Sequence, residues 1–95
     1  MKKIYICHPY RDNPAGNAIR ALEIAREVAR MGDLPIAPQI YLPQFLDGEE
    51  RAMECCFTLL KCCDEILVAA GGVTAGMRQE IALARSLGIP IERQP

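Results

Sequence analysis

The sequence predicts an α/β fold in which four parallel strands form one sheet and three helices cover both of its faces, giving three layers. Short apolar runs alternate with longer amphipathic stretches along the whole chain, which is the pattern of strand–helix–strand units. One apolar run is marked by prolines and another is continuous, as expected for an edge strand and a central strand. The 95 residues, 51% hydrophobic and 24% charged, suit one globular domain over residues 1–95.

The first half of the chain contains two expected strands around one helix. Residues 4–7 form an apolar, β-rich run. Asn13 is a suitable cap for a helix over residues 14–31, which has proline at its first position. Residues 34–37 form the second strand, and because Pro35 cannot donate a ladder hydrogen bond, this strand belongs at a sheet edge.

The second half supplies two further helices and two strands. Asp47 opens the second helix, and Glu50 completes a capping-box pattern. The continuous apolar run 66–70 suits a central parallel strand. Thr74 then caps the third helix, and residues 89–91 form the last strand.

The strand order places the functional site. With the proline-marked strand at an edge and the continuous strand inside, the expected order is 2-1-3-4. In such a sheet the chain reverses direction between the first and third strands, and ligands bind there, beyond the carboxyl ends of the strands. Residues 7–12 and 70–80 meet at this point, so we expect the functional residues in these two segments.

A glycine-rich turn leads into the third expected helix. The segment Gly71-Gly72-Val73-Thr74-Ala75-Gly76 allows a ligand to approach the backbone closely. The helix start offers free N–H groups and a partial positive charge beside the Thr74 hydroxyl, which suits a phosphate or a carboxylate. A turn of this composition that binds nothing is the alternative.

Glu80 falls inside the apolar stripe of the same helix, between Met77 and Ile81. A carboxylate on a buried or crevice-facing stripe pays a desolvation penalty unless it has a partner or a task. At the crevice it can attack the anomeric carbon of a sugar or stabilise an oxocarbenium ion. The alternative is a salt bridge, for example with Arg11 or with an adjacent chain.

Tyr10 and Arg11 follow the first strand and therefore lie near the same crevice. A guanidinium there can hold a phosphate or carboxylate in a bidentate fork. A solvated arginine in a polar loop is the alternative.

Charge, cysteine content and histidine content exclude several classes of protein. The formal net charge is -1 and the pI is about 5.8, which gives no electrostatic basis for binding a nucleic acid polymer or an anionic membrane. An odd number of cysteines does not suggest a disulfide framework, and no run approaches the ~20 apolar residues of a membrane span. We therefore expect a cytoplasmic protein.

We expect no metal and no cofactor. His8 is the only histidine, which excludes a multi-histidine metal site. Cys56 and Cys63 line up on one helical face, where zinc ligation is possible, but buried small residues are the better interpretation.

Several short motifs then occur in an ordered series. These are Lys3-Ile4-Tyr5-Ile6, Pro9-Tyr10-Arg11, Cys63-Asp64, Thr74-Ala75-Gly76-Met77-Arg78-Gln79-Glu80, and Ile81-Ala82-Leu83-Ala84 with Gly88-Ile89-Pro90. In order and spacing they resemble the nucleoside 2-deoxyribosyltransferases, in particular the small bacterial and phage members. The resemblance extends over nearly the whole chain and implies a Rossmann-like or flavodoxin-like domain.

The resemblance implies an enzyme that cleaves or exchanges the N-glycosidic bond of deoxynucleosides, or that hydrolyses deoxynucleoside monophosphates. Glu80 matches the catalytic nucleophile of the family, which forms a covalent deoxyribosyl intermediate, and Tyr5 matches a tyrosine near it. Transferases usually carry an aspartate at the position of Thr74, whereas the nucleotide-hydrolysing branch has a serine that receives the 5′-phosphate. Thr74 with Arg11 therefore favours a nucleotide. The expected substrate- and phosphate-binding residues are Pro9, Tyr10, Arg11, Gly72, Thr74, Gly76 and Met77.

One departure from the family pattern concerns proton transfer. The family places a second catalytic aspartate eight residues before the aspartate that opens the next strand, and here that position is Cys56. A thiol does not guide a proton to the leaving base as that aspartate does, so acid assistance has no assigned residue. The alternative to an enzyme is therefore a non-catalytic module of the same fold that binds a nucleotide or a nucleotide-derived signal. A third hypothesis is a structural subunit with a vestigial pocket.

We expect residues 40–46 to form an apolar loop that exposes Tyr41 and Phe45. This loop either closes over a small-molecule ligand, a nucleotide or nucleoside, or packs on a second subunit. Since a small domain gains stability from such an interface, we expect a homodimer or a larger homo-oligomer.

Overall fold

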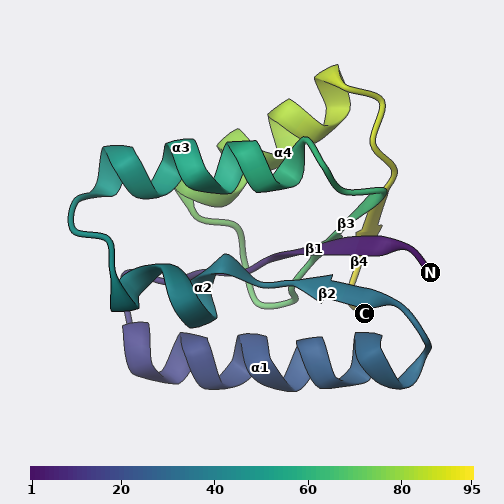
Figure 1. Cartoon of the computed structure of the whole chain (residues 1–95), viewed down its shortest axis with the longest axis horizontal. Helices are drawn as coiled ribbons and strands as arrows, with labels where there is room; N and C mark the ends of the chain where they lie inside the picture. The colour runs from purple at the N-terminus through teal and green to yellow at the C-terminus, as the bar shows by residue number, and fades with distance from the viewer.

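A computed structural model describes all residues from 1 to 95 and contains four strands and four α-helices (Figure 1). In chain order the elements are β1 (Lys3–Cys7), α1 (Pro14–Arg30), β2 (Leu34–Ile36), α2 (Pro38–Tyr41), a 3₁₀ helix η1 (Leu42–Gln44), α3 (Glu49–Leu60), β3 (Glu65–Val68), α4 (Ala75–Ser86) and β4 (Ile91–Arg93).

The strands form one parallel sheet in the order β2-β1-β3-β4, which confirms the predicted topology. In Figure 1, α3 and α4 lie above the sheet and α1 lies below it, while α2 lies to the left of β2 at about the same height. The predicted α/β fold with helices on both faces of the sheet is therefore confirmed. The two central strands, β1 and β3, end on the same side of the molecule, where the crevice was expected.

Alternate side chains of β1 enter two separate cores. Tyr5 and Cys7 face α3 and α4 and pack with Leu60 and Met77. Ile4 and Ile6 face the other way and pack with buried residues of α1. Because neighbouring side chains of a strand point to opposite faces, Tyr5 lies in the same layer as α4, on which Glu80 lies.

The prediction of only three helices, with a loop at residues 40–46, was wrong. Residues Pro38–Tyr41 form α2 and Leu42–Gln44 form η1. Each of these helices has a proline in its first turn, where the missing N–H would have no intrahelical partner in any case. The prolines that suggested a loop therefore start two short helices.

The start of α3 also differs from the prediction. The helix is preceded by Gly48, at φ +88°, and no side chain caps it. A positive φ favours glycine, so the turn is fixed at Gly48 and the predicted capping box of Asp47 and Glu50 does not form. As a consequence Glu49, rather than Asp47, is the first acidic residue at the helix start.

The two other helix caps are as predicted. Asn13 accepts a hydrogen bond from the Gly16 amide, and the Thr74 hydroxyl accepts one from the Met77 amide. The last strand begins later than predicted because Pro90 cannot donate to the ladder, although its carbonyl accepts from the Ile66 amide. None of the helices combines the length and the apolar character that are needed to cross a bilayer.

Candidate functional site

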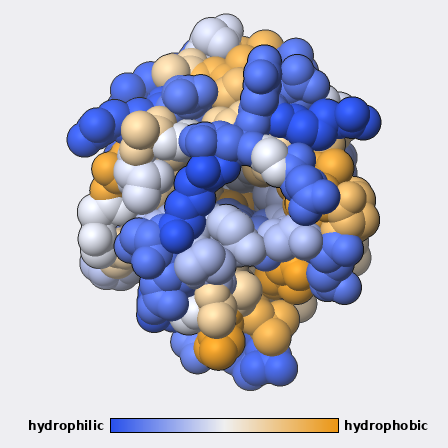
Figure 2. All heavy atoms as spheres, turned by 90° about the vertical axis from the view of Figure 1, so that its left-hand side faces the viewer, coloured by the Kyte–Doolittle hydropathy of each residue, from blue (hydrophilic) through white to orange (hydrophobic).

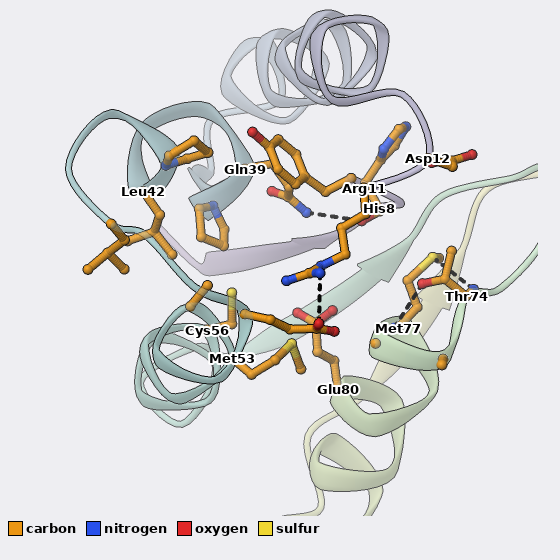
Figure 3. Close-up of a pocket in the computed structure, with 18 of the residues that line it drawn as sticks. His8, Arg11, Asp12, Gln39, Leu42, Met53, Cys56, Thr74, Met77 and Glu80 are labelled. Atoms are coloured by element: carbon orange, nitrogen blue, oxygen red, sulfur yellow. Dashed lines mark hydrogen bonds and ion pairs between the residues drawn. The ribbon is translucent and has the colours of Figure 1, made fainter.

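A cavity of about 650 Å³ opens at the carboxyl ends of β1 and β3. Its walls come from the β1–α1 loop, from α2 and η1, and from the starts of α3 and α4. Figure 2 views the molecule from this side and shows a hollow near the centre, framed by hydrophilic side chains. In the close-up, Glu80 lies at the floor and Arg11 extends over it from the opposite wall (Figure 3). A cavity of this volume is in the range of small-molecule sites.

Glu80 is held by two side chains of β1. Its side chain comes from the second turn of α4, and the residue is only 6% exposed. The Tyr5 hydroxyl donates a hydrogen bond to Oε2. On the other oxygen, the Cys7 thiol lies with its Sγ 3.9 Å from Oε1. The carboxyl group is thus fixed by neutral donors of the strand β1 beneath it.

No cation compensates the charge of Glu80. The ion pairs of the structure join other residues, so the alternative of an Arg11–Glu80 salt bridge is wrong. Burial raises the pKa of Glu80 from its ordinary value of 4.5 to about 7, while the hydrogen bonds from Tyr5 and Cys7 act in the opposite direction. The group therefore changes protonation near neutral pH, as a carboxylate poised for chemistry does.

Cys56 of α3 lines the cavity close to the Tyr5–Glu80 pair. Burial raises its pKa to about 11, although the neighbouring Tyr5 hydroxyl acts in the opposite direction. The thiol is therefore protonated at neutral pH. Burial and the nearby Glu80 also raise the pKa of Tyr5, whose hydroxyl remains a donor over the same range. A neutral thiol therefore lies beside the Tyr5–Glu80 pair.

The start of α4 forms one side of the cavity. The Thr74 hydroxyl accepts from the Met77 amide at 3.2 Å and keeps its own proton free to donate. The amides of Ala75 and Gly76 have no partner within the helix, because they lie in its first turn. This wall presents hydrogen-bond donors and the positive end of the helix dipole to the cavity.

The opposite side of the mouth carries an ion pair. The Arg11 Nη1 lies 2.7 Å from Oε2 of Glu49, the first residue of α3. Both residues line the cavity. Their side chains remain 60% and 66% exposed, so solvent screens the pair.

Gln39 of α2 brings a buried acceptor to the cavity wall. Its Nε2 donates to the carbonyl oxygens of Ile6, at 3.0 Å, and His8, at 3.4 Å. Since both partners are acceptors, the amide orientation is fixed. Its Oε1 is buried and has no hydrogen-bond partner. Such an atom is rare in a folded protein and marks a place where a ligand donor or a water fits.

The structure brings most of the predicted site residues together. Tyr10, Arg11, Thr74, Gly76, Met77 and Glu80 line the cavity. Tyr5 lies beneath it and reaches it through Glu80. Pro9 and Gly72 are not among the lining residues, and Pro9 instead borders a smaller polar depression on the α1 side of the sheet.

Sequence reasoning missed Gln39, Glu49 and Met53, which all line the cavity. Gln39 lies in the segment adjoining the predicted loop, and Glu49 was hidden by the one-residue error at the start of α3. For Gln39 the sequence carries a signal, since it directly follows Pro38, a residue suited to a helix start. No group of three or more side chains of metal-ligating types comes together in the structure.

The fold is that of the 2-deoxyribosyltransferases. The structure is similar to the 2-deoxyribosyltransferase of Leishmania mexicana, with a TM-score of 0.79 and 17% identity over 98% of this chain and 63% of that chain. It is also similar to the 2-deoxyribosyltransferase of the psychrotolerant bacterium Bacillus psychrosaccharolyticus, with a TM-score of 0.67 and 18% identity over 96% of this chain and 70% of that chain. The chain thus spans less than two thirds of the length of the Leishmania enzyme.

Residues 2–94 match the family described as a domain of unknown function, DUF7768, and the chain belongs to this family. None of the curated proteins matches it.

Proposed function

We propose that this protein cleaves or exchanges the N-glycosidic bond of a nucleoside 5′-monophosphate or a nucleoside, with Glu80 as the nucleophile. The main observation behind the proposal is the burial, missing ion pair and raised pKa of the Glu80 carboxylate. It is buried at the floor of a cavity, makes no ion pair, and has a pKa raised by burial to about 7. A structural carboxylate is normally paired when it is this deeply buried.

In the proposed reaction, an oxygen of ionised Glu80 attacks C1′ of the sugar. The bond between C1′ and the base nitrogen breaks, and the base leaves with the bonding electron pair and takes a proton from solvent. Water, or a second base, then attacks C1′ and releases the sugar from Glu80. Tyr5 and Cys7 keep the two carboxyl oxygens in one orientation through this sequence.

The walls of the cavity supply binding groups for the remaining parts of the substrate. Thr74 and the free amides of α4 suit a 5′-phosphate or a 5′-hydroxyl. Arg11 adds a cation on the other side. The unpartnered Oε1 of Gln39 suits an N–H donor of the base, so we expect bases with an exocyclic amino group to bind better than those without one.

Two comparisons support the deoxyribose part of the proposal. The solved structures of similar fold are named as 2-deoxyribosyltransferases. Because their sequence identity to this chain is low, a deoxyribosyl activity must be assigned from individual residues of the site and not from the shared fold. Here these residues are Glu80 and Tyr5, which the sequence motifs single out and which form a hydrogen bond.

A non-catalytic module that binds a nucleotide is the second candidate, and Cys56 is the observation that favours it. This thiol stays protonated up to a pKa of about 11 and so cannot act as a carboxylate beside Glu80. A protein of this kind retains the cavity and its donors but releases no base.

The experiment is chromatography for free base after incubation with a panel of 2′-deoxynucleosides, their 5′-monophosphates and the matching ribose compounds. We expect release from at least one compound and a loss of at least about a thousandfold in Glu80→Gln, since a nucleophile has no substitute. Glu54→Gln, which changes an exposed glutamate of α3, is the matched control and should retain activity. Binding without release would favour the binding module, and release that survives Glu80→Gln would refute the nucleophile assignment.

For assembly, we propose a homodimer that uses the exposed rings of Tyr41 and Phe45. Their centroids lie 5.8 Å apart, and both side chains are open to solvent beside the cavity wall. Neighbouring exposed aromatic rings are typical of an interface. Sedimentation should give a dimer that Phe45→Ser weakens, whereas a monomer at micromolar concentration would refute the proposal.

A further inference from the structure

We propose that Glu49 competes with the substrate phosphate for Arg11, and so determines how strongly this site prefers a nucleotide to a nucleoside. The inference rests on the proposed function, because it concerns ligands of the same cavity. It adds a residue that neither the motifs nor the comparisons assign.

The Arg11–Glu49 ion pair lies at the mouth of the cavity. Arg11 belongs to the β1–α1 loop and Glu49 to the start of α3, so their contact of 2.7 Å joins two walls across the mouth of the cavity. In Figure 3 the Arg11 guanidinium lies above Glu80, between the α3 and α4 sides. A phosphate that reaches Arg11 from within the cavity therefore meets Glu49 on the same guanidinium.

The cavity lining carries more acidic than basic side chains. Apart from Arg11, the charged groups on the lining are the carboxylates of Asp12 and Glu49, together with Glu80 where it is ionised. With Glu49 bound, the positive charge of Arg11 is compensated and the cavity repels an anion. With Glu49 displaced, Arg11 and the donors of α4 face the ligand together.

The phosphate and the Glu49 carboxylate differ in how strongly they bind the Arg11 guanidinium. A phosphate monoester carries a charge of about -1.5 to -2 at neutral pH and can bind a guanidinium in a bidentate fork, whereas Glu49 brings one charge. Because both side chains of the pair are exposed, the contact is weak and gives way to the stronger anion. A nucleoside has no such anion, so it binds with the Arg11–Glu49 pair intact.

The test is calorimetry on the intact protein and two variants, Glu49→Gln and Glu50→Gln. Glu50 is the next residue of α3, is exposed and makes no ion pair, so its variant removes an equal charge without freeing Arg11. The probes are 2′-deoxynucleoside 5′-monophosphates, the matching 2′-deoxynucleosides, and 2-deoxyribose 5-phosphate.

We expect Glu49→Gln to raise the ratio of nucleoside Kd to nucleotide Kd about three- to fivefold, the range that an exposed ion pair supports. Glu50→Gln should change this ratio less than twofold. Added salt should reduce the difference between the variants, because it screens both the pair and the phosphate. The Kd of 2-deoxyribose 5-phosphate should change between the variants in the same direction as the Kd of the nucleotide.

The outcomes separate this inference from the proposed function. Equal ratios in both glutamine variants, or an unchanged ratio in Glu49→Gln, would overturn the competition even if base release continued. The expected shift without any base release would support the competition and refute the enzyme. If none of the probes bound to any of the three proteins, both proposals would be overturned.

Discussion

The floor and the mouth of the cavity are built in opposite ways. At the floor, Glu80 is buried and its two oxygens are held by Tyr5 and Cys7, all within one packed layer. At the mouth, Arg11 and Glu49 come from two separate segments, and each remains more than half exposed. The floor contains one uncompensated carboxylate, and the mouth contains a compensated pair.

Under the proposed function, this difference means that reactivity and ligand selectivity are carried by different parts of the molecule. A buried, uncompensated carboxylate changes protonation near neutral pH, which serves bond-breaking but destabilises the fold. An exposed pair contributes little to stability and can be exchanged for a ligand. Changes at the floor should therefore affect stability and chemistry strongly, and changes at the mouth should affect mainly ligand choice.

The largest change in folding stability should come from removing the charge of Glu80 at the floor of the cavity. Because the folded-state pKa of Glu80 is about 7 and its ordinary value is 4.5, folding disfavours the ionised form. The contribution of this group to stability is fully present below pH 4.5 and is lost as the pH rises to 7. Glu80→Gln, which stays neutral, should be more stable than the natural protein at pH 8 by about 3 kcal/mol.

Urea unfolding at pH 8 and at pH 4.5 measures this difference. The gain should nearly vanish at the lower pH, where Glu80 in the natural protein is protonated. Glu54→Gln, at an exposed position, should give no comparable gain at either pH. A Glu80→Gln variant that is less stable than the natural protein at pH 8 would contradict the uncompensated charge.

Tyr5→Phe, also at the floor of the cavity, should have a smaller effect, which we expect on the pKa of Glu80 and on the rate. The Tyr5 hydrogen bond lowers the pKa of Glu80, so its removal should raise that pKa from its value of about 7. The acidic limb of the rate, or of ligand binding, should move to higher pH, and the rate at neutral pH should fall about tenfold. A carbon-13 NMR titration of the Glu80 carboxyl group measures the pKa without any need for activity. A lowered or unchanged value would mean that Tyr5 only fills space.

The floor is also the part of the site that the sequence predicts best. Glu80 lies three residues from Met77 and one from Ile81, so helical periodicity alone places it on the buried side of α4. Tyr5 is one of four buried residues in the short strand β1, and strand alternation fixes its direction. Local pattern and burial are sufficient here because both elements are regular.

The mouth could not be predicted in the same way. The Arg11–Glu49 pair joins residues 38 positions apart, through a turn whose cap differs by one residue from the predicted one. Gln39 depends on α2, where prolines start a helix that had been expected to be a loop. Such contacts depend on how irregular segments pack, which periodicity does not report. The sequence therefore predicts the proposed nucleophile better than the groups proposed to select its ligand.

The cap of α4 lies between the floor and the mouth of the cavity. Its loss should change the folding stability by less than Glu80→Gln and by more than Arg11→Gln. Thr74→Ala removes the hydroxyl that accepts from the Met77 amide, which should destabilise the fold by about 1 kcal/mol. Thr58→Ala is the matched control, because its hydroxyl bonds the Glu54 carbonyl inside α3 and caps nothing. Equal losses in chemical denaturation would show that the cap does not stabilise α4.

The smallest effect on stability should come from the mouth. Arg11→Gln breaks the pair with Glu49, yet because both side chains are exposed, the stability should change by less than about 0.5 kcal/mol. The same variant should weaken nucleotide binding about tenfold, because a charge-assisted bidentate contact to phosphate is lost. Unfolding and calorimetry on one preparation compare the two numbers directly. If instead stability fell by as much as the gain expected for Glu80→Gln, the mouth would be part of the folding core, and the separation of reactivity from selectivity would be wrong.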